Sequence, residues 1–227
     1  MNKRLSAAIA ALGLVATAIA APAAAQSPER RLPWSDVPQS RSQPALHAFA
    51  ACVAGSETRR ARAVLAMDYR TPAYDRALEQ LLQRNVFCLE HSRAGSSHRF
   101  FAGRIAEALL LRDIRGSDLG RHVARDPARP PIQARDETEL MAFCTVRAAP
   151  VQVADLFATR PAGPEEAAAI QALTPQIGQC LAAGATGQFN RAALRSLLGL
   201  AAYRLSQHNG AARTARVGAA SLDGTIR

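Results

Sequence analysis

The chain has 227 residues, of which 48% are hydrophobic and only 5% aromatic, and its formal net charge is +10. This length allows one domain or two small ones. Because few aromatic side chains are available to stack on bases, the composition disfavours nucleic acid as a partner. Alanine supplies much of the apolar fraction, so we expect closely packed helices around a thin core that a covalent cross-link would stabilise.

The first 25 residues have the pattern of a secretory signal peptide. Lys3 and Arg4 form a basic start, residues 5–21 are apolar, and residues 23–25 are all alanine. We expect cleavage after Ala25 and a periplasmic or secreted protein. A retained membrane anchor is the alternative, but the apolar run is short and dominated by alanine. The later apolar stretches are too short, or too interrupted by arginine, to span a bilayer.

Three further segments lack the periodicity of a packed helix. Residues 26–44 contain proline, serine and arginine and are predicted to form an extended arm. Residues 113–137 have balanced charge and several prolines, which predicts a linker with a helical turn near Leu119. Residues 206–227 are rich in glycine, alanine and arginine, and we expect a disordered tail.

The rest of the chain is an internal repeat. A shift of 92 positions, without gaps, places Cys52 on Cys144 and Cys88 on Cys180, and residues 45–112 on the segment that ends at residue 204. Apolar residues recur at helical spacing in both copies, and no segment has the alternation of a strand. The repeat therefore predicts an all-α fold of two tandem pseudo-symmetric units, at 45–112 and 138–205, with about four helices each.

Helix start signals divide the two units. Thr71 and Pro72 are predicted to cap and open the third helix of the first unit. Pro164 does the same in the second unit, where Glu165 and Glu166 suit the positive end of the helix dipole. A buried stripe is expected on the first helix of the chain, and Asn190 is expected to cap the last one. Each unit therefore has its own local helix signals.

Four cysteines in an exported chain predict two disulfides. Three pairings are possible, and the duplication favours pairing within each unit, Cys52 with Cys88 and Cys144 with Cys180. A zinc site is the alternative, but the sequence has no CxxC pair and no Cys–His pair at ligand spacing. The same absence disfavours redox catalysis. We therefore expect structural cysteines, no metal and no cofactor.

No standard catalytic signature is present in the sequence, which lacks GxSxG, P-loop, HExxH and calcium-loop motifs. No histidine or acidic residue occupies the same position in both units. His91 and His98, near Glu90, are the best scattered candidates for acid–base chemistry. The pattern disfavours an enzyme and leaves a divergent periplasmic hydrolase as an alternative.

Two groups of arginines are candidates for anion binding. Arg99 and Arg191 occupy equivalent positions in the first turn of the last helix of each unit, an unfavourable place for a cation. They fit either an anion site or a structural contact that locks the preceding loop to the helix. Arg59, Arg60 and Arg62 belong to a basic surface of the first unit only, which is a candidate site for anionic glycolipid or polysaccharide.

The cysteine-led helix, the proline-started helix and the closing segment FNRAALRSLLGLAAYRL resemble a group of exported helical proteins of sphingomonad-type alphaproteobacteria. The resemblance covers roughly residues 45–205 and implies no activity, cofactor or site residue. We expect a non-enzymatic binding or interaction module of the cell envelope, with its site in a groove between the two units. The expected partner is another envelope protein or an anionic envelope component.

Overall fold

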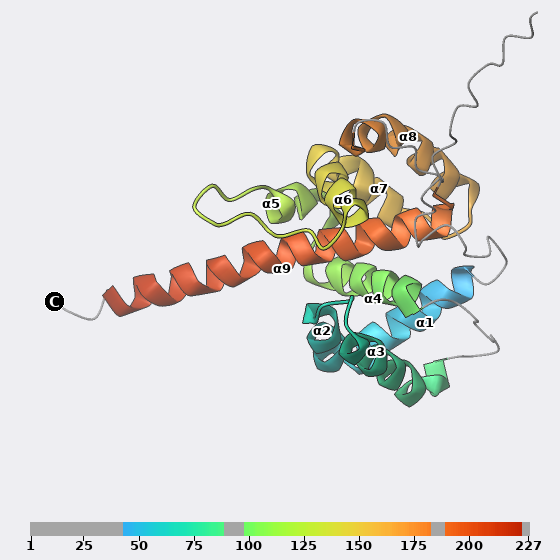
Figure 1. Ribbon diagram of the computed structural model, residues 1–227, viewed down its shortest axis with the longest axis horizontal. Coiled ribbons are helices and arrows are strands. Elements are labelled where there is room, and N and C mark those ends of the chain that lie inside the picture. Colours follow the sequence, from blue (N-terminus) through green and yellow to red (C-terminus); the bar gives the residue numbers. More distant parts are fainter. Residues whose placement is uncertain (1–42, 89–97, 183–188, 224–227) are drawn as a thin grey trace, which may run out of the picture. The chain divides into compact units, whose positions relative to one another are not determined.

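The computed structural model describes residues 43–88, 98–182 and 189–223, and every regular element among them is helical (Figure 1). The predicted all-α class is confirmed. For residues 98–99 and 211–223 only the backbone is described. The predicted signal peptide and most of the predicted arm lie outside the described residues. Gln43 and Pro44 belong to the first turn of a helix, so the arm ends earlier than expected.

The first half of the chain contains α1 (Gln43–Ser56), α2 (Thr58–Ala66), α3 (Pro72–Arg84), the 3₁₀ segment η1 (Val86–Cys88) and α4 (His98–Asp113). Leu46 and Phe49 are buried on the inner face of α1, as the apolar spacing predicts. The Thr71 hydroxyl accepts a hydrogen bond from the Tyr74 backbone N–H at 3.3 Å, and Pro72 is the first helical residue. The predicted start of this helix is therefore confirmed.

The second half contains α6 (Glu137–Ala148), α7 (Pro150–Ala158), α8 (Pro164–Cys180) and α9 (Arg191–Asp223). Pro164 opens α8 as predicted, and the Asn190 side chain accepts a hydrogen bond from the Ala193 backbone N–H at 2.8 Å. The α-helices of the two halves follow one another in the same order. Their tandem pseudo-symmetry remains a prediction.

The predicted linker contributes to the core. It contains the 3₁₀ segment η2 (Gly116–Asp118) and α5 (Leu119–Val123), which includes the turn expected near Leu119. Leu119, Val123 and Ile114 are buried in the same apolar cluster as residues of both halves. The two halves and the segment between them therefore share one hydrophobic core.

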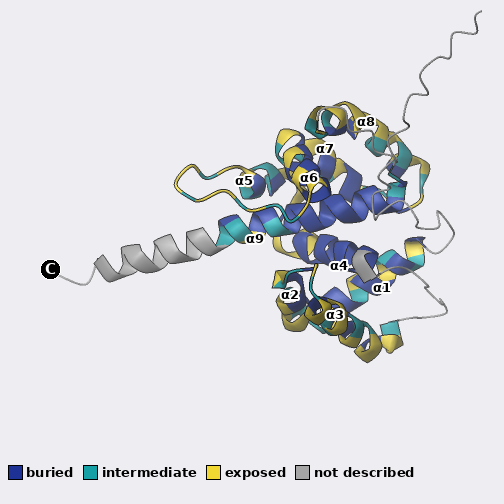
Figure 2. Ribbon diagram, viewed as in Figure 1, coloured by how far each residue is buried: buried dark blue, intermediate teal, exposed yellow. Residues whose placement is uncertain are grey.

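Helices α4 and α9 lie side by side and are buried over most of their described length (Figures 1 and 2). Glycines allow their backbones to touch. A Cβ atom added at Gly103 would lie 2.2 Å from the Ser196 carbonyl oxygen, and one added at Gly199 would lie 2.8 Å from the Gly103 carbonyl oxygen. At this crossing the structure therefore has tightly packed helices where we expected a groove between the units.

Helix α9 continues to Asp223, whereas the sequence predicted a disordered tail from Ser206. The first turn of that predicted tail is held by a tertiary contact. Ser206 is buried, and the Asn209 side chain donates hydrogen bonds to the carbonyl oxygens of His122 and Ala124 at 2.7 and 2.8 Å. These bonds satisfy buried polar groups. The sequence around Asn209 has no apolar periodicity that would have predicted a packed helix there.

Candidate functional site

Both predicted disulfides are present. Cys52–Cys88 joins α1 to η1 with a Cα–Cα distance of 5.8 Å, and Cys144–Cys180 joins α6 to the last residue of α8 with a distance of 5.6 Å. Disulfides of this kind are typical of oxidising compartments such as the periplasm or the extracellular space. Because neither pair forms a CxxC motif, these cysteines have the geometry of structural cross-links.

The basic surface of the first half is largely neutralised by its own neighbours. Arg60 forms an ion pair with Glu57 at 3.0 Å, and Arg62 contacts both carboxylate oxygens of Asp113 at 2.6 and 2.9 Å. Arg59 is exposed and has no acidic partner among the described residues. Only one of the three predicted arginines is therefore available to an external anion without breaking an internal pair.

Arg191 makes a contact within the fold. It is half-buried, and its Nη1 donates to the Gly163 carbonyl oxygen, at the start of α8, at 3.4 Å. This is a contact within the fold, as in the structural alternative, but it reaches the turn before α8 and not the loop before α9. The side chains of Arg99 and His98, and the whole of His91, lie outside the described residues.

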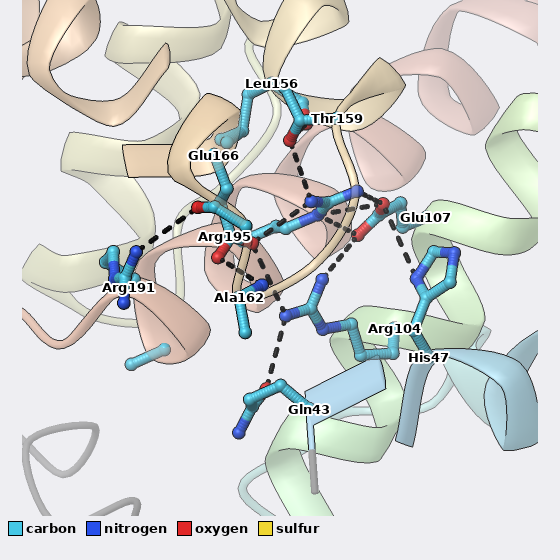
Figure 3. A network of polar contacts seen from close by, with 12 residues as sticks. Gln43, His47, Arg104, Glu107, Leu156, Thr159, Ala162, Glu166, Arg191 and Arg195 are labelled. Carbon is cyan, nitrogen blue, oxygen red and sulfur yellow. Dashed lines mark hydrogen bonds and ion pairs between the residues drawn. The ribbon is translucent and has the colours of Figure 1, made fainter. Parts of the chain in front are cut away.

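The structure also contains a buried charge cluster that the sequence analysis did not predict (Figure 3). We use this name for Arg104 and Glu107 on α4, Glu166 on α8 and Arg195 on α9. None of these four side chains is more than 2% exposed. Two cations and two anions balance, so the cluster has no net formal charge when all four are ionised.

Arg195 is the best-bonded member of the cluster. Its Nε and Nη2 donate to Glu107 Oε1 at 3.0 and 2.7 Å, and its Nη1 donates to Glu166 Oε1 at 3.0 Å. It also donates to the Thr159 hydroxyl and the Phe157 carbonyl oxygen, both at 3.1 Å. Burial lowers the pKa of Arg195, but its bonds to Glu107 and Glu166 outweigh burial and raise this pKa above the ordinary value.

Glu166 is held by a strained turn. Its Oε2 accepts a hydrogen bond at 2.9 Å from the backbone N–H of Ala162, a non-glycine residue with a φ of 63°. Few non-glycine residues adopt this left-handed conformation, which costs of order 1–3 kcal/mol. The turn before α8 therefore places one carboxylate of the cluster, and Gly163, the residue after Ala162, accepts the bond from Arg191.

Arg104 is bonded less well. Its Nη1 lies 3.3 Å from Glu107 Oε2 and its Nη2 lies 3.4 Å from Gln43 Oε1, while Glu166 is 4.0 Å away. Its Nε has no hydrogen-bond partner among the described residues. Burial lowers the pKa of Arg104 below its ordinary value.

His47, on α1, is the only described histidine beside the cluster. Its Nδ1 lies 3.9 Å from Glu107 Oε1, which is too far for a hydrogen bond. The side chain is 30% exposed, and burial lowers its pKa, an effect that Glu107 opposes and Arg195 and Arg104 reinforce. The geometry therefore lacks the hydrogen bond by which a carboxylate orients a catalytic imidazole.

A second polar group joins the end of the predicted linker to both halves, and within it the Arg135 backbone N–H donates to Glu139 Oε2 at 2.7 Å. Arg204 on α9 pairs with Glu139 on α6, and burial lowers the pKa of Arg204 to about 10. Tyr69 donates a hydrogen bond of 2.5 Å to Asp136, and the Arg135 guanidinium lies 4.8 Å from the centre of the Tyr69 ring. These contacts fix the end of the linker against the loop between α2 and α3.

Other kinds of site are not found among the described residues. No group of three or more histidine, cysteine or acidic side chains is arranged to hold a metal ion in residues 43–88, 98–182 and 189–223. A small pocket beside α4, η2 and α7 is lined mainly by apolar residues such as Leu110 and Phe157. No single described helix is long and apolar enough to cross a membrane, although α6 and α7 together reach that limit as a pair bent by 98°.

Comparison with known proteins gives no further assignment. No protein-family model, no curated protein and no solved structure matches the chain. The resemblance to exported alphaproteobacterial proteins therefore remains a prediction.

The charge cluster could not be predicted from the residues that the two repeats share. In the 92-residue register, Arg104 lies opposite Ser196, Glu107 opposite Gly199, and Arg195 opposite Gly103. The only local signal was Arg104 and Glu107, oppositely charged and three residues apart in an otherwise apolar helix. Glu107 and Arg195, which have no counterpart in the other repeat, bond to each other between α4 and α9.

Proposed function

We propose that this chain is a non-enzymatic interaction module of the cell envelope. The observation that carries this proposal is the state of the charge cluster. A general acid or base must reach its substrate within hydrogen-bond distance. Arg104, Glu107 and Arg195 are each 0% exposed, and Glu166 is 2% exposed, so the strongest charged groups are bonded to one another inside the core.

The two disulfides support an exported location, because such bonds persist in oxidising compartments. Exposed apolar side chains support an interaction role. Val86 and Phe87 on η1 are 60% and 65% exposed, Leu140 on α6 is 59% exposed, and Val151 on α7 is 67% exposed. Large apolar side chains on a helical surface are common elements of protein–protein contacts.

Site-specific photo-cross-linking in intact cells tests this proposal. A photoreactive amino acid replaces Leu140, Val151 or Phe87, and Gln80, an exposed polar residue of α3, serves as the matched control. We expect discrete adducts of defined mass from at least one apolar position and none from Gln80. The proposal is contradicted if no apolar position yields an adduct and the purified protein turns over a hydrolytic substrate in a reaction that His47→Ala abolishes.

A further inference from the structure

One exposed face of α6 carries apolar side chains between two opposite charges. It comprises Glu137, Leu140, Cys144, Arg147 and Ala148, which we call the α6 ridge. At 3.6 residues per turn these positions span about 100° of the helix circumference. Arg147 is half-buried and the other four are exposed, and Figure 2 shows exposed residues along this helix. The buried residues of α6 pack in the core with α8 and α9, and the end of α8 lies beside the ridge, where Cys180 is bonded to Cys144.

The charges at the two ends of the ridge are not neutralised within the fold. Glu137 has no cationic partner among the described residues. The Arg147 Nε donates to the Val123 carbonyl oxygen at 3.2 Å, and no described carboxylate contacts this guanidinium. Burial, and then the charge of the nearby Arg125, lower the pKa of Arg147. The start of α6 therefore has an unpaired acid, and its end has two neighbouring cations.

We propose that two copies of this chain associate through the α6 ridge, with their α6 helices antiparallel about a twofold axis that crosses the ridge midway between Leu140 and Cys144. Glu137 and Arg147 are ten residues, or about 15 Å, apart along the helix. This antiparallel arrangement places Glu137 opposite Arg147 of the partner subunit, and Leu140 opposite Cys144 of the partner subunit. The contact is isologous, so each ion pair occurs twice.

Charge complementarity along one helix favours a second copy as the occupant. An acid at the start, an arginine at the end and an apolar stretch between them match the same surface turned through 180°. The corresponding face of α1, 92 residues earlier, is Ala45, Ala48, Cys52, Gly55 and Ser56, which has no charge and no large apolar residue. The α6 ridge is therefore particular to the second half and is not a by-product of the repeat.

A single helix pair buries less surface than a standard stable interface, so we expect a dissociation constant on the order of 10–100 μM. Opposite helix dipoles add a small favourable contribution. The inference rests on the proposed function only in one respect: both proposals assign a binding role to exposed side chains of this chain. Self-association can fail while the chain still binds another envelope protein.

Sedimentation equilibrium of the purified chain, with both disulfides formed, tests the inference. The natural sequence should give a monomer–dimer equilibrium. Glu137→Arg and Arg147→Glu should each weaken association about tenfold, because each substitution removes two symmetric ion pairs. The double variant Glu137→Arg/Arg147→Glu restores both pairs with reversed polarity, and its dissociation constant should return to within about threefold of the original.

Matched controls separate this contact from general effects. Glu165→Arg removes an exposed acid from the first turn of α8 and should leave association unchanged. Leu140→Asp should abolish the dimer, whereas Val86→Asp, at a similarly exposed apolar position, should not. If Arg147→Glu does not fold, Leu140→Asp and Glu137→Arg decide the question.

The inference is overturned if the chain stays monomeric up to about 1 mM, if the folded double variant is no better than its parents, or if Leu140→Asp and Val86→Asp behave alike. A monomer that cross-links to another envelope protein at Leu140 overturns self-association and leaves the proposed function intact. A dimer that hydrolyses a substrate supports self-association and contradicts the proposed non-enzymatic function.

Discussion

Arg195 on α9 donates to Glu107 Oε1 on α4 from Nε and Nη2, at 3.0 and 2.7 Å, and neither side chain is exposed to solvent. Such a buried pair adds little net stability over a well-packed apolar pair. Removing one partner, however, leaves an uncompensated charge in the core. We infer that Arg195 and Glu107 mainly specify how α4 and α9 pack together.

A double-mutant cycle measures this coupling. Arg195→Met and Glu107→Leu should each lower the free energy of unfolding by about 3–5 kcal/mol, because each strands a buried charge. The double variant leaves one cation, Arg104, and one anion, Glu166, in the cluster. Its loss of unfolding free energy should therefore be smaller than the sum of the two single losses, by at least about 2 kcal/mol. Urea unfolding gives these values, and simple additivity would contradict the inferred coupling.

Gly103→Ala should destabilise the protein by about 1–3 kcal/mol or more, because the new methyl group would lie 2.2 Å from the Ser196 carbonyl oxygen and force α4 and α9 apart. Gly178→Ala in α8 is the matched control. A Cβ at Gly178 meets no atom within 4 Å, so this substitution should stabilise the helix by about 0.5–1 kcal/mol. Thermal or urea unfolding of both variants tests the close approach; equal effects would argue against it.

Stability should depend on pH through His47. Burial lowers its pKa in the folded protein below the value of 6.5 that it has when exposed. Between these two pKa values the unfolded chain binds more protons, so stability falls as pH drops below about 6.5. His47→Gln should lose less stability than the natural sequence between pH 7.5 and pH 5.5. Parallel pH profiles for the two proteins would show that His47 does not contribute.

The basic surface of the first half should behave as a solvated surface with internal ion pairs. Arg62→Gln should cost about 0.5–1 kcal/mol of stability, because it breaks the contact with Asp113, whereas Arg59→Gln should cost almost nothing. On anionic lipid vesicles, Arg59→Gln and the control Arg76→Gln should reduce retention by the same small amount. Selective loss with Arg59→Gln would instead support the glycolipid or polysaccharide alternative.

The sequence predicted what depends on local signals. Helix starts at Pro72 and Pro164 follow from capping and proline preferences, and the disulfide pairing follows from the equal spacing of the cysteines. The packing of the turn from Ser206 to Asn209 could not be predicted, because Asn209 bonds to a segment more than 80 residues away.

The candidate site was harder to predict because its members come from three helices that are distant in sequence. Comparison of the repeats selected Arg99 and Arg191, and the structure shows Arg191 bonded to the Gly163 carbonyl oxygen. Glu107 and Arg195 meet at the centre of the cluster. Neither is found at the equivalent position of the other repeat, so shared residues could not indicate them. Where the two repeats pack against each other, an ion pair needs an acid on one helix and a base on the other. Identical residues on both helices cannot form such a pair.

Hydrogen exchange of Glu107→Gln, read by mass spectrometry, tests most directly whether the charge cluster is the structural link between the halves. If it is, the slowest-exchanging amides of α1 and α8 should lose protection together, by about 10²–10³-fold, because both depend on the same packing of α4 against α9. Loss of protection in one half alone, or unchanged protection in both, would contradict this account of the cluster.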